Sequence, residues 1–437
     1  PGDKLTSGRK IAADEIAAYF HTGGTTGTPK LVRHTHLNQV SQAWVVNLML
    51  KSMPGGCVLF GLPLFHVGGA LTQGLTTFAG GGAVVVLSPS GWRNPNSVKN
   101  VWKLIERFKP KVFGAVPTIV AAALNVPVGN ADISSLEVSS AGASTVPVPV
   151  GKQWEELTKT RMQEVYGMTE TSGVHTISYA DRPIHLGAVG HSVPFARTRI
   201  VKIDHDGKFL GDCKLNEIGV VAMAGPGVFS GYLNDRHNKE AFVEPGWVNS
   251  GDLGRIDENG YLWITGRAKD IIIRGGHNID PMPIEEILFQ HPAVGLAAVV
   301  GQPDAHAGEL PVAYVQLKPD VKADPGELIE FVRARTPERA AVPVNLFPIS
   351  PMPLTAVGKV FKPDLRWDAA RRVFSNALAT LANQGIGVDV HVGAHSTHGT
   401  LATITLKGVP DATRASLEKE VHERLNPFTV RHEVRWG

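Results

Sequence analysis

The chain has 437 residues, of which 43% are hydrophobic and 19% are charged, and its formal net charge at pH 7 is +3. These values are typical of a globular protein of about two or three domains, and the small net charge argues against charge-driven binding to nucleic acid or to a membrane surface. Two cysteines are too few for a disulfide framework and no apolar run is long enough to span a bilayer, so we expect a cytoplasmic protein without a transmembrane segment.

The first distinctive segment is a loop rich in glycine and threonine, which follows Ala17–Phe20, an apolar run typical of a buried strand. Its glycines leave backbone amides unshielded, its threonines add hydroxyl groups and its lysine adds a positive charge, which together suit a polyphosphate. It is not a Walker loop, because Pro29 precedes the lysine and Leu31 follows it. A flexible surface turn is the alternative interpretation. The residues expected to bind phosphate are Thr22, Gly23, Gly24, Thr25, Thr26, Gly27 and Lys30.

As far as about residue 265, short apolar runs alternate with amphipathic segments. Runs typical of strands are 58–62, 83–87, 112–116 and 162–166, and segments typical of helices are 97–108 and 147–159. This alternation predicts an α/β fold with a mostly parallel sheet and helical crossovers. Shorter runs and turn signals between residues 188 and 263 predict a small β region appended to it.

Residues 266–270 mark an expected joint between domains. The segment after the joint predicts a compact α+β unit that closes with a polar loop ending at Lys359; its elements are helix 283–290, strands 297–301 and 312–318, helix 325–335 and strand 342–348. The sequence therefore predicts the remainder of a large domain (1–265), a small mobile C-terminal domain (266–363) and an α+β tail (364–437).

The tail repeats the order of elements in the small domain. Its predicted elements are helix 367–382, strands 388–392 and 401–407, helix 412–425 and strand 429–434. Two interpretations stay open: a degenerate second copy of the small domain, or a generic α+β extension. The tail ends before any counterpart of Lys359, so a second copy would carry no such lysine.

Polar segments follow several of the predicted strands. His66 lies at a strand end among small residues, a position that by itself is more typical of a structural histidine than of a catalytic one. Residues 141–144 expose backbone against which a flat base could lie, and Glu170 offers a carboxylate that suits Mg²⁺. Asp252 could accept two ribose hydroxyl groups. Because the carboxyl ends of parallel strands meet at one edge of a sheet, we expect these groups to lie close together.

Five motifs follow one another along the chain: TGGTTGTPK (22–30), YGMTET (166–171), SGDLG (250–254), GRAKD (266–270) with Gly275-Gly276, and PLTAVGK (353–359). Their sequence and order resemble those of the AMP-forming acyl-CoA synthetase superfamily, which also includes luciferases and peptide-synthetase adenylation domains. The resemblance runs from Ala17 to about Lys362 and leaves the tail out. It implies that the usual N-terminal subdomain is absent, so we expect a fragment, in agreement with a chain that opens at Pro1 and reaches the phosphate loop almost at once.

The resemblance implies a two-step reaction that uses ATP, Mg²⁺ and coenzyme A. A carboxylate attacks the α-phosphate of ATP, which gives acyl-AMP and pyrophosphate; the small domain then turns about the joint, and the thiol of coenzyme A attacks the acyl carbonyl. The implied partner is a small-molecule carboxylic acid. The implied catalytic residues are Lys359, Thr169, Glu170 and His66, with Glu170 as the metal ligand. Beyond the phosphate loop, the implied nucleotide- and coenzyme-binding residues are Ala141, Gly142, Ala143, Ser144, Tyr166, Gly167, Asp252, Arg267, Lys269, Gly275 and Gly276.

Three of these implied roles have an alternative interpretation. Lys359 is implied to neutralise charge on the α-phosphate and on the attacking carboxylate, an electrostatic role for which a solvated loop lysine is the alternative. Lys269 resembles the hinge residue whose backbone torsions change, with a charged linker as the alternative. Gly275 and Gly276 resemble the glycines that line the pantetheine tunnel, with a simple turn as the alternative.

Gly167 bears on the choice of acid. In relatives restricted to acetate a tryptophan at this position walls off the acyl pocket, and glycine leaves room for a longer or bulkier acid. We therefore expect a medium- or long-chain fatty acid, with an aromatic acid as the alternative. A non-catalytic nucleotide-binding module is the alternative from another class, since a fragment without part of its pocket wall can be inactive on its own.

Overall fold

The computed structural model describes residues 7–22, 30–50, 55–204, 206–395 and 397–437. The chain divides into two compact units. The first comprises the described residues up to Ala268 together with Ala356–Lys359, and the second comprises Lys269–Thr355 and Val360–Gly437. Within the described ranges, no helix is long and apolar enough to cross a membrane.

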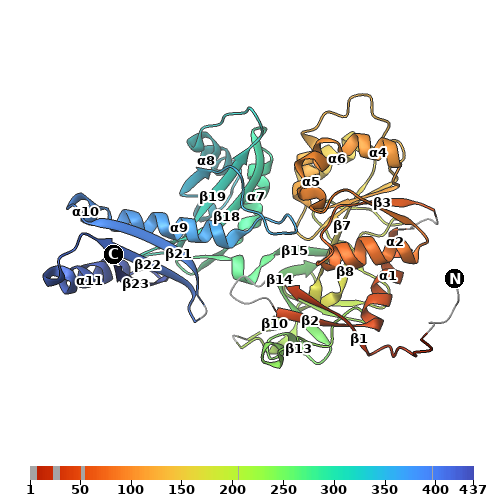
Figure 1. Cartoon of the computed structure of the whole chain (residues 1–437), viewed down its shortest axis with the longest axis horizontal. Coiled ribbons are helices and arrows are strands. Elements are labelled where there is room, and N and C mark those ends of the chain that lie inside the picture. Colours follow the sequence, from red (N-terminus) through yellow and green to blue (C-terminus); the bar gives the residue numbers. More distant parts are fainter. Residues whose placement is uncertain (1–6, 23–29, 51–54, 205, 396) are drawn as a thin grey trace. The chain divides into compact units, whose positions relative to one another are not determined.

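A seven-stranded sheet runs through the first unit in the order β4–β3–β5–β6–β7–β8–β9. Its strands β3, β7 and β8 are labelled in Figure 1. Neighbouring strands are parallel from β4 to β7, whereas β8 and β9 are antiparallel. The predicted mostly parallel sheet is thereby confirmed. The strands are β3 (Cys57–Phe60), β4 (Ala83–Val86), β5 (Val112–Ala115), β6 (Val138–Gly142), β7 (Met162–Met168), β8 (Gly173–Ile177) and β9 (His191–Ser192).

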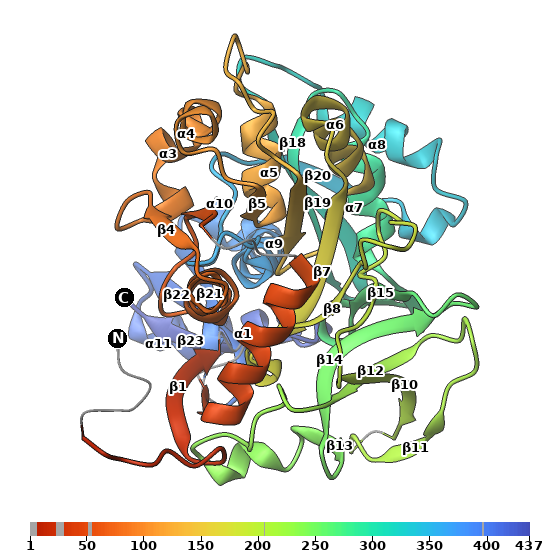
Figure 2. The same ribbon diagram turned by 90° about the vertical axis from the view of Figure 1, so that its right-hand side faces the viewer.

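Helices cover this sheet, and they differ from the predicted helices in two places. The predicted helix 97–108 is two helices separated at Asn100, and the first begins earlier because the side chain of Asn94 accepts a hydrogen bond from the amide of Asn96. Helix α1, which the apolar pattern did not predict, packs on β8 (Figure 2). The helices are α1 (His36–Leu50), a π-helix (Gly68–Leu75), α2 (Thr76–Ala79), α3 (Pro95–Lys99), α4 (Val101–Phe108), α5 (Pro117–Leu124) and α6 (Val148–Thr158), with 3₁₀ turns at Gly91–Arg93, Thr169–Thr171 and Asp235–Asn238.

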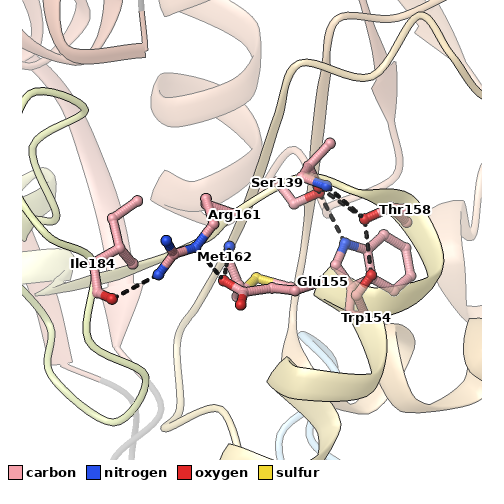
Figure 3. A network of polar contacts seen from close by, with 8 residues as sticks. Ser139, Trp154, Glu155, Thr158, Arg161, Met162 and Ile184 are labelled. Carbon is pink, nitrogen blue, oxygen red and sulfur yellow. Dashed lines mark hydrogen bonds and ion pairs between the residues drawn. The ribbon is translucent and has the colours of Figure 1, made fainter.

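A polar network fastens α6 to the beginnings of β6 and β7 (Figure 3). Nε1 of Trp154 donates to the hydroxyl of Ser139 at 2.8 Å, and Trp154 is completely buried. Glu155 accepts hydrogen bonds from Nε of Arg161 (3.0 Å) and from the amide of Met162 (2.9 Å). Because buried polar groups need partners, this network fixes where the two strands start and hence where their carboxyl ends emerge.

The appended β region is an antiparallel sheet in the order β11–β10–β12–β14–β13, with β15 paired to β14. A separate pair, β1 and β2, lies on either side of the predicted phosphate loop: β1 ends at Thr22 and β2 begins at Lys30. The strands are β1 (Ile16–Thr22), β2 (Lys30–Thr35), β10 (Arg197–Ile203), β11 (Phe209–Asp212), β12 (Gly219–Ala224), β13 (Phe242–Glu244), β14 (Trp247–Ile256) and β15 (Leu262–Arg267).

The second unit opens with a five-stranded sheet in the order β17–β16–β19–β18, with β20 paired to β19. β18 and β19 are antiparallel, and β20 runs parallel to β19. After a 3₁₀ turn (Ala268–Asp270), the elements are β16 (Ile272–Arg274), β17 (His277–Ile279), α7 (Pro281–Phe289), β18 (Val294–Asp304), β19 (Gly308–Leu317), α8 (Pro325–Arg333), a 3₁₀ turn (Arg339–Ala341) and β20 (Asn345–Pro348).

The rest of the second unit is a three-stranded sheet in the order β21–β22–β23, covered by helices. The predicted helix 367–382 starts at Lys362 and is interrupted at Leu378, so that two helices form. α9 is shared, because Leu365 and Ala369 pack against the first sheet while Ala370 and Phe374 pack against the second. The elements are α9 (Lys362–Ala377), α10 (Ala379–Asn383), β21 (Gly387–His395), β22 (Gly399–Lys407), α11 (Asp411–Leu425) and β23 (Arg431–Trp436).

Candidate active site

Thr169 and Glu170 directly follow β7 in a 3₁₀ turn, and their exposures are 7% and 5%. The hydroxyl of Tyr232 donates a hydrogen bond of 2.6 Å to Oε1 of Glu170. Burial raises the pKa of Glu170, whereas this hydrogen bond and the charges of Lys30 and Arg267 act in the opposite direction. The carboxylate is therefore desolvated, oriented and close to cations, the state in which it could hold a divalent ion.

Asp252 in β14 lies opposite Arg267 in β15. Nε of Arg267 donates to Oδ1 at 2.9 Å, and the hydroxyl of Tyr166 donates to Oδ2 at 2.8 Å. Asp252 is 7% exposed, and burial together with its charge raises the pKa of Tyr166. Two donors hold this carboxylate in one orientation, as an acceptor for ribose hydroxyl groups requires.

Lys359 adds a buried cation to the same unit. Its pKa is lowered from 10.5 to about 8, first by burial and then by the positive charge of Arg267, against the opposing effect of Asp252 and Glu170. A lysine with such a pKa keeps its proton at neutral pH. It is thus a desolvated ammonium group that stabilises developing negative charge better than a hydrated one.

The surroundings of Lys359 include a histidine predicted to be catalytic. The hydroxyl of Thr118, in α5, donates to the carbonyl oxygen of Gly358 at 2.7 Å. The pKa of His66 is lowered to about 4, mainly by burial and further by Lys359 and His21. The imidazole is therefore neutral at physiological pH, and Nδ1 of His66 is an acceptor within 3.1 Å of the amide of Gly68. It can orient groups but carries no charge.

The segment expected to face adenine is placed differently from the prediction. Ala141 and Gly142 lie within β6 rather than after a strand. A Cβ atom at Gly142 would come within 2.4 Å of Cγ2 of Val165, so the neighbouring strand requires glycine there. Ala143 has φ = +73°, a left-handed conformation that is unfavourable by about 1–2 kcal/mol for a residue with a side chain. Backbone strain of this kind concentrates at functional sites, and Ser144 follows directly.

The close approach of the neighbouring strand by itself requires glycine at position 167. A Cβ atom at this position would lie 1.8 Å from the carbonyl oxygen of Gly173 on β8. The register of the two strands shifts between Tyr166 and Gly167, which brings the backbones together. A side chain at 167 therefore cannot be added to this backbone without moving β8.

Only the ends of the predicted phosphate loop lie within the described residues. Thr22 and Lys30 pair across β1 and β2. Gly23, Gly24, Thr25, Thr26 and Gly27 lie outside the described ranges. Nζ of Lys30 lies 4.9 Å from the centroid of the Tyr232 ring, a cation–π contact.

The remaining predicted residues belong to the second unit. Lys269 is its first described residue, and the carbonyl oxygen of Lys269 accepts a hydrogen bond from Arg366 at 3.3 Å. Gly275 and Gly276 form the two-residue turn between β16 and β17, with φ of +56° and +86°. Such a turn needs positive φ at both positions, so its geometry alone accounts for the two glycines.

The first unit thus brings together Tyr166, Glu170, Asp252, Arg267 and Lys359. Among the residues with described positions, no three potential histidine, cysteine or carboxylate ligands gather, so a divalent ion held by Glu170 would depend on phosphate oxygens and water for its other ligands.

Sequence reasoning missed two side chains that touch the site. Nε2 of His34 lies 2.7 Å from the carbonyl oxygen of Thr169, and Tyr232 binds Glu170. His34 is separated from Thr169 by 135 residues along the sequence, and Tyr232 is separated from Glu170 by 62. No local sequence pattern indicates a contact between residues so far apart in the chain. The only available signal for Tyr232 was its position beside Gly231 in a turn-rich segment.

Two family comparisons cover much of the chain. Residues 3–233, more than half of it, match the AMP-binding enzyme family, and residues 283–359 match the AMP-binding enzyme C-terminal domain. The chain is 40% identical over 389 residues to the marinolic acid–CoA ligase of Pseudoalteromonas sp. (strain SANK 73390). It is 33% identical over 351 residues to a long-chain-fatty-acid–CoA ligase of Bacillus subtilis (strain 168) and 32% identical over 378 residues to the indoleacetate–CoA ligase of Aromatoleum aromaticum.

These matches cover 87%, 80% and 85% of this chain but 59%, 61% and 71% of the three relatives, so the chain spans about three fifths of the first two. Among solved structures, ATP-bound MatB from Rhodopseudomonas palustris is similar with a TM-score of 0.73 at 28% identity, over 81% of this chain and 68% of that one. The o-succinylbenzoate coenzyme A synthetase of Bacillus subtilis in complex with ATP and magnesium has a TM-score of 0.68 at 29% identity, over 81% and 70%. Together with the family matches, these similarities show that the chain belongs to the AMP-binding enzyme family.

Proposed function

We propose that the protein activates a carboxylic acid with ATP to give acyl-AMP and pyrophosphate, and then transfers the acyl group to the thiol of coenzyme A with release of AMP. The observation that carries this proposal is the group of charged side chains in the first unit, in which Glu170, Asp252, Arg267 and Lys359 influence one another. The three relatives are all named as CoA ligases, and two of the similar structures hold ATP.

In the first step, an oxygen of the acid forms a bond to the α-phosphorus while the bond from that phosphorus to the β-bridging oxygen breaks. Asp252 would hold the ribose, with Tyr166 against the base and Thr169 near the α-phosphate. Glu170 would hold Mg²⁺, which when bound neutralises phosphate charge. Lys359 would face both the incoming carboxylate and the α-phosphate, and would stabilise the charge that builds up between them.

The second step requires a different arrangement of the small domain. We propose Lys269 as the hinge, at the point where the second unit begins, and residues 266–363 as the mobile domain. Gly275 and Gly276 would lie along the path of coenzyme A.

For the tail we propose a degenerate second copy of the small domain. What supports this is the shared topology: in both, the first two strands are antiparallel, a helix follows, and the third strand runs parallel to the second. The alternative, a generic extension, predicts no such agreement.

The proposed acid is a medium- or long-chain fatty acid, as for the Bacillus relative, with an aromatic acid as the second candidate, as for the indoleacetate ligase. An apolar pocket gains about 0.8 kcal/mol per buried CH₂, so each added CH₂ should raise the specificity constant about fourfold until the pocket is full.

Acid-dependent release of pyrophosphate tests the proposal. It is measured with this chain, ATP, Mg²⁺ and acids of graded length from acetate to palmitate, with benzoate and indoleacetate in parallel. Release that rises with chain length supports the fatty-acid assignment, and a preference for the ring-containing acids supports the second. Nucleotide binding without release for any acid would identify a non-catalytic binding module.

A further inference from the structure

Tyr232 belongs to a short segment that extends the strand leading out of the phosphate loop. Tyr232 pairs with Val32 of β2, the amide of Arg33 donates to the carbonyl oxygen of Gly231 at 3.1 Å, and the amide of Leu233 donates to that of Leu31 at 2.8 Å. The backbone of this segment is therefore tied to β2, whose first residue is Lys30.

The side chain of Tyr232 contacts two charged groups of the site at once. Its hydroxyl donates to Oε1 of Glu170 at 2.6 Å, and its ring lies beneath Nζ of Lys30, 4.9 Å from the centroid. The ring is 6% exposed and packs edge-on against Phe229 at 4.9 Å, so its position is fixed by its surroundings.

Glu170 needs such a partner. Glu170 is 5% exposed, and a buried carboxylate that loses a donor is left with an unsatisfied oxygen and rotates more freely. With Oε1 held by the hydroxyl group, the carboxylate keeps one orientation, which pre-forms a site for a hard cation. Partners of metal ligands commonly act in this way.

We propose that Tyr232 is the positioning residue that couples the two halves of the nucleotide site: its hydroxyl group orients Glu170 for the divalent ion, and its ring holds Lys30 at the end of the phosphate loop. The inference rests on the proposed function. It predicts that metal binding and phosphate binding depend on different parts of one side chain.

Binding of Mn²⁺ in the presence of ATP, followed by the electron paramagnetic resonance signal of the free ion, separates the two parts. Tyr232→Phe removes only the hydroxyl, so we expect Mn²⁺ affinity to fall about 10- to 100-fold while metal-free ATP binds as before. Tyr232→Leu also removes the ring, so metal-free ATP should bind more weakly as well. Tyr261→Phe is the matched control: Tyr261 is 4% exposed, and its hydroxyl donates to the carbonyl oxygen of Pro183 at 2.6 Å. This control should bind Mn²⁺ like the parent.

A double-mutant cycle distinguishes positioning from a merely structural role. In a Glu170→Gln background, Tyr232→Phe should cause no further loss of Mn²⁺ affinity, because the group that it orients is no longer a charged ligand. An equal loss in both backgrounds would overturn the inference, as would parent-like Mn²⁺ binding by folded Tyr232→Phe. Failure of the proposed function looks different: the parent would release no pyrophosphate with any acid, although the effect of Tyr232→Phe on Mn²⁺ affinity would persist.

Discussion

Two parts of the second unit share one topology but bury their sheets differently. The strands β18 and β21 open the two comparable sheets, and each pairs antiparallel with the next strand. Along β18 the consecutive residues Ala297 to Val300 are all buried, whereas along β21 buried Val390 and Val392 alternate with exposed Asp389 and His391. The first sheet is therefore covered on both faces, and the tail sheet presents a polar face.

The shared helix α9 explains the difference. It covers the second face of the first sheet with Leu365 and Ala369, and the inner face of the tail sheet with Ala370 and Phe374. Two features that we connect with function lie outside the topology that the two sheets share: the turn at Gly275-Gly276 precedes β18, and the segment ending at Lys359 follows β20. A shared topology therefore need not carry these two features, because both lie in connecting segments.

The largest expected effects concern the cores on the two sides of α9. Phe374→Ala should destabilise the tail by about 3–5 kcal/mol and Leu365→Ala the first sheet by about 2–5 kcal/mol, because both side chains are at most 1% exposed. Hydrogen exchange read segment by segment checks this. We expect faster exchange only in β21–β23 for Phe374→Ala and only in β18–β20 for Leu365→Ala, because each sheet then has a core that unfolds independently. Equal acceleration everywhere in both would show a single cooperative body.

The next effect concerns Lys359, with the exposed tail residue Lys407 as its control. Lys359→Ala should reduce acid-dependent pyrophosphate release by about 2.7–4 kcal/mol in activation free energy, a factor of about 10²–10³, because a desolvated cation is lost from the developing charge. Thioester formation from supplied acyl-adenylate should be spared. Lys407→Ala, which removes an exposed lysine of the tail, should leave both steps unchanged. Equal loss of both half-reactions in Lys359→Ala would contradict the assigned role.

A smaller effect is expected at two glycines with positive φ, one in the β16–β17 turn and the other at the start of β22. Gly276 and Gly399 have φ of +86° and +71°, and an added Cβ atom would meet nothing within 4 Å at either position. Valine should therefore introduce a similar strain of about 1–2 kcal/mol at both. Only Gly276→Val should also raise the Michaelis constant for coenzyme A, and Gly276→Asn, which tolerates positive φ, should strain the turn less. A parent-like constant in Gly276→Val would argue against a coenzyme path along this turn.

The smallest effect is a pH dependence. Because the pKa of Lys359 is about 8, pyrophosphate release should fall about fivefold between pH 8 and pH 9, as the ammonium group loses its proton. Lys359→Arg should flatten this decline. Between pH 8 and 10.5 the unfolded chain binds more protons at this lysine than the folded one, so its contribution to the free energy of unfolding rises with pH and cannot cause the loss. A rate that stays constant to pH 10 would contradict the assigned role.

Much of the fold could be predicted from local patterns. Apolar runs located β3, β4, β5 and β7 to within a few residues, because buried parallel strands are continuous apolar segments. Helix α1 was not predicted, because its apolar residues are not confined to one face: Val45 and Val46 are buried, but Val40 and Trp44 are exposed. The interruption of the predicted helix 367–382 at Leu378 was not predicted either, since the apolar periodicity continues through it.

The candidate site residues that lie in or next to a sequence motif could be proposed from the sequence. Glu170 and Asp252 were singled out because each follows or lies in a segment with a recognisable pattern, and the structure adds the contacts of Asp252 with Arg267 and Tyr166. Tyr232 could not be found, because its role depends on a long-range contact with Glu170 and on the pairing of two distant backbones. Long-range geometry of this kind has no local sequence signature.

The most direct test is a crystal structure of the chain with an unreactive acyl-adenylate analogue, an adenosine acyl sulfamate. The ribose should lie within hydrogen-bond distance of Asp252, the base against Tyr166, and the group that replaces the α-phosphate near Thr169 and Lys359. An analogue that is bound elsewhere, out of reach of both Asp252 and Lys359, would contradict the assignment of these residues to one adenylate-forming site.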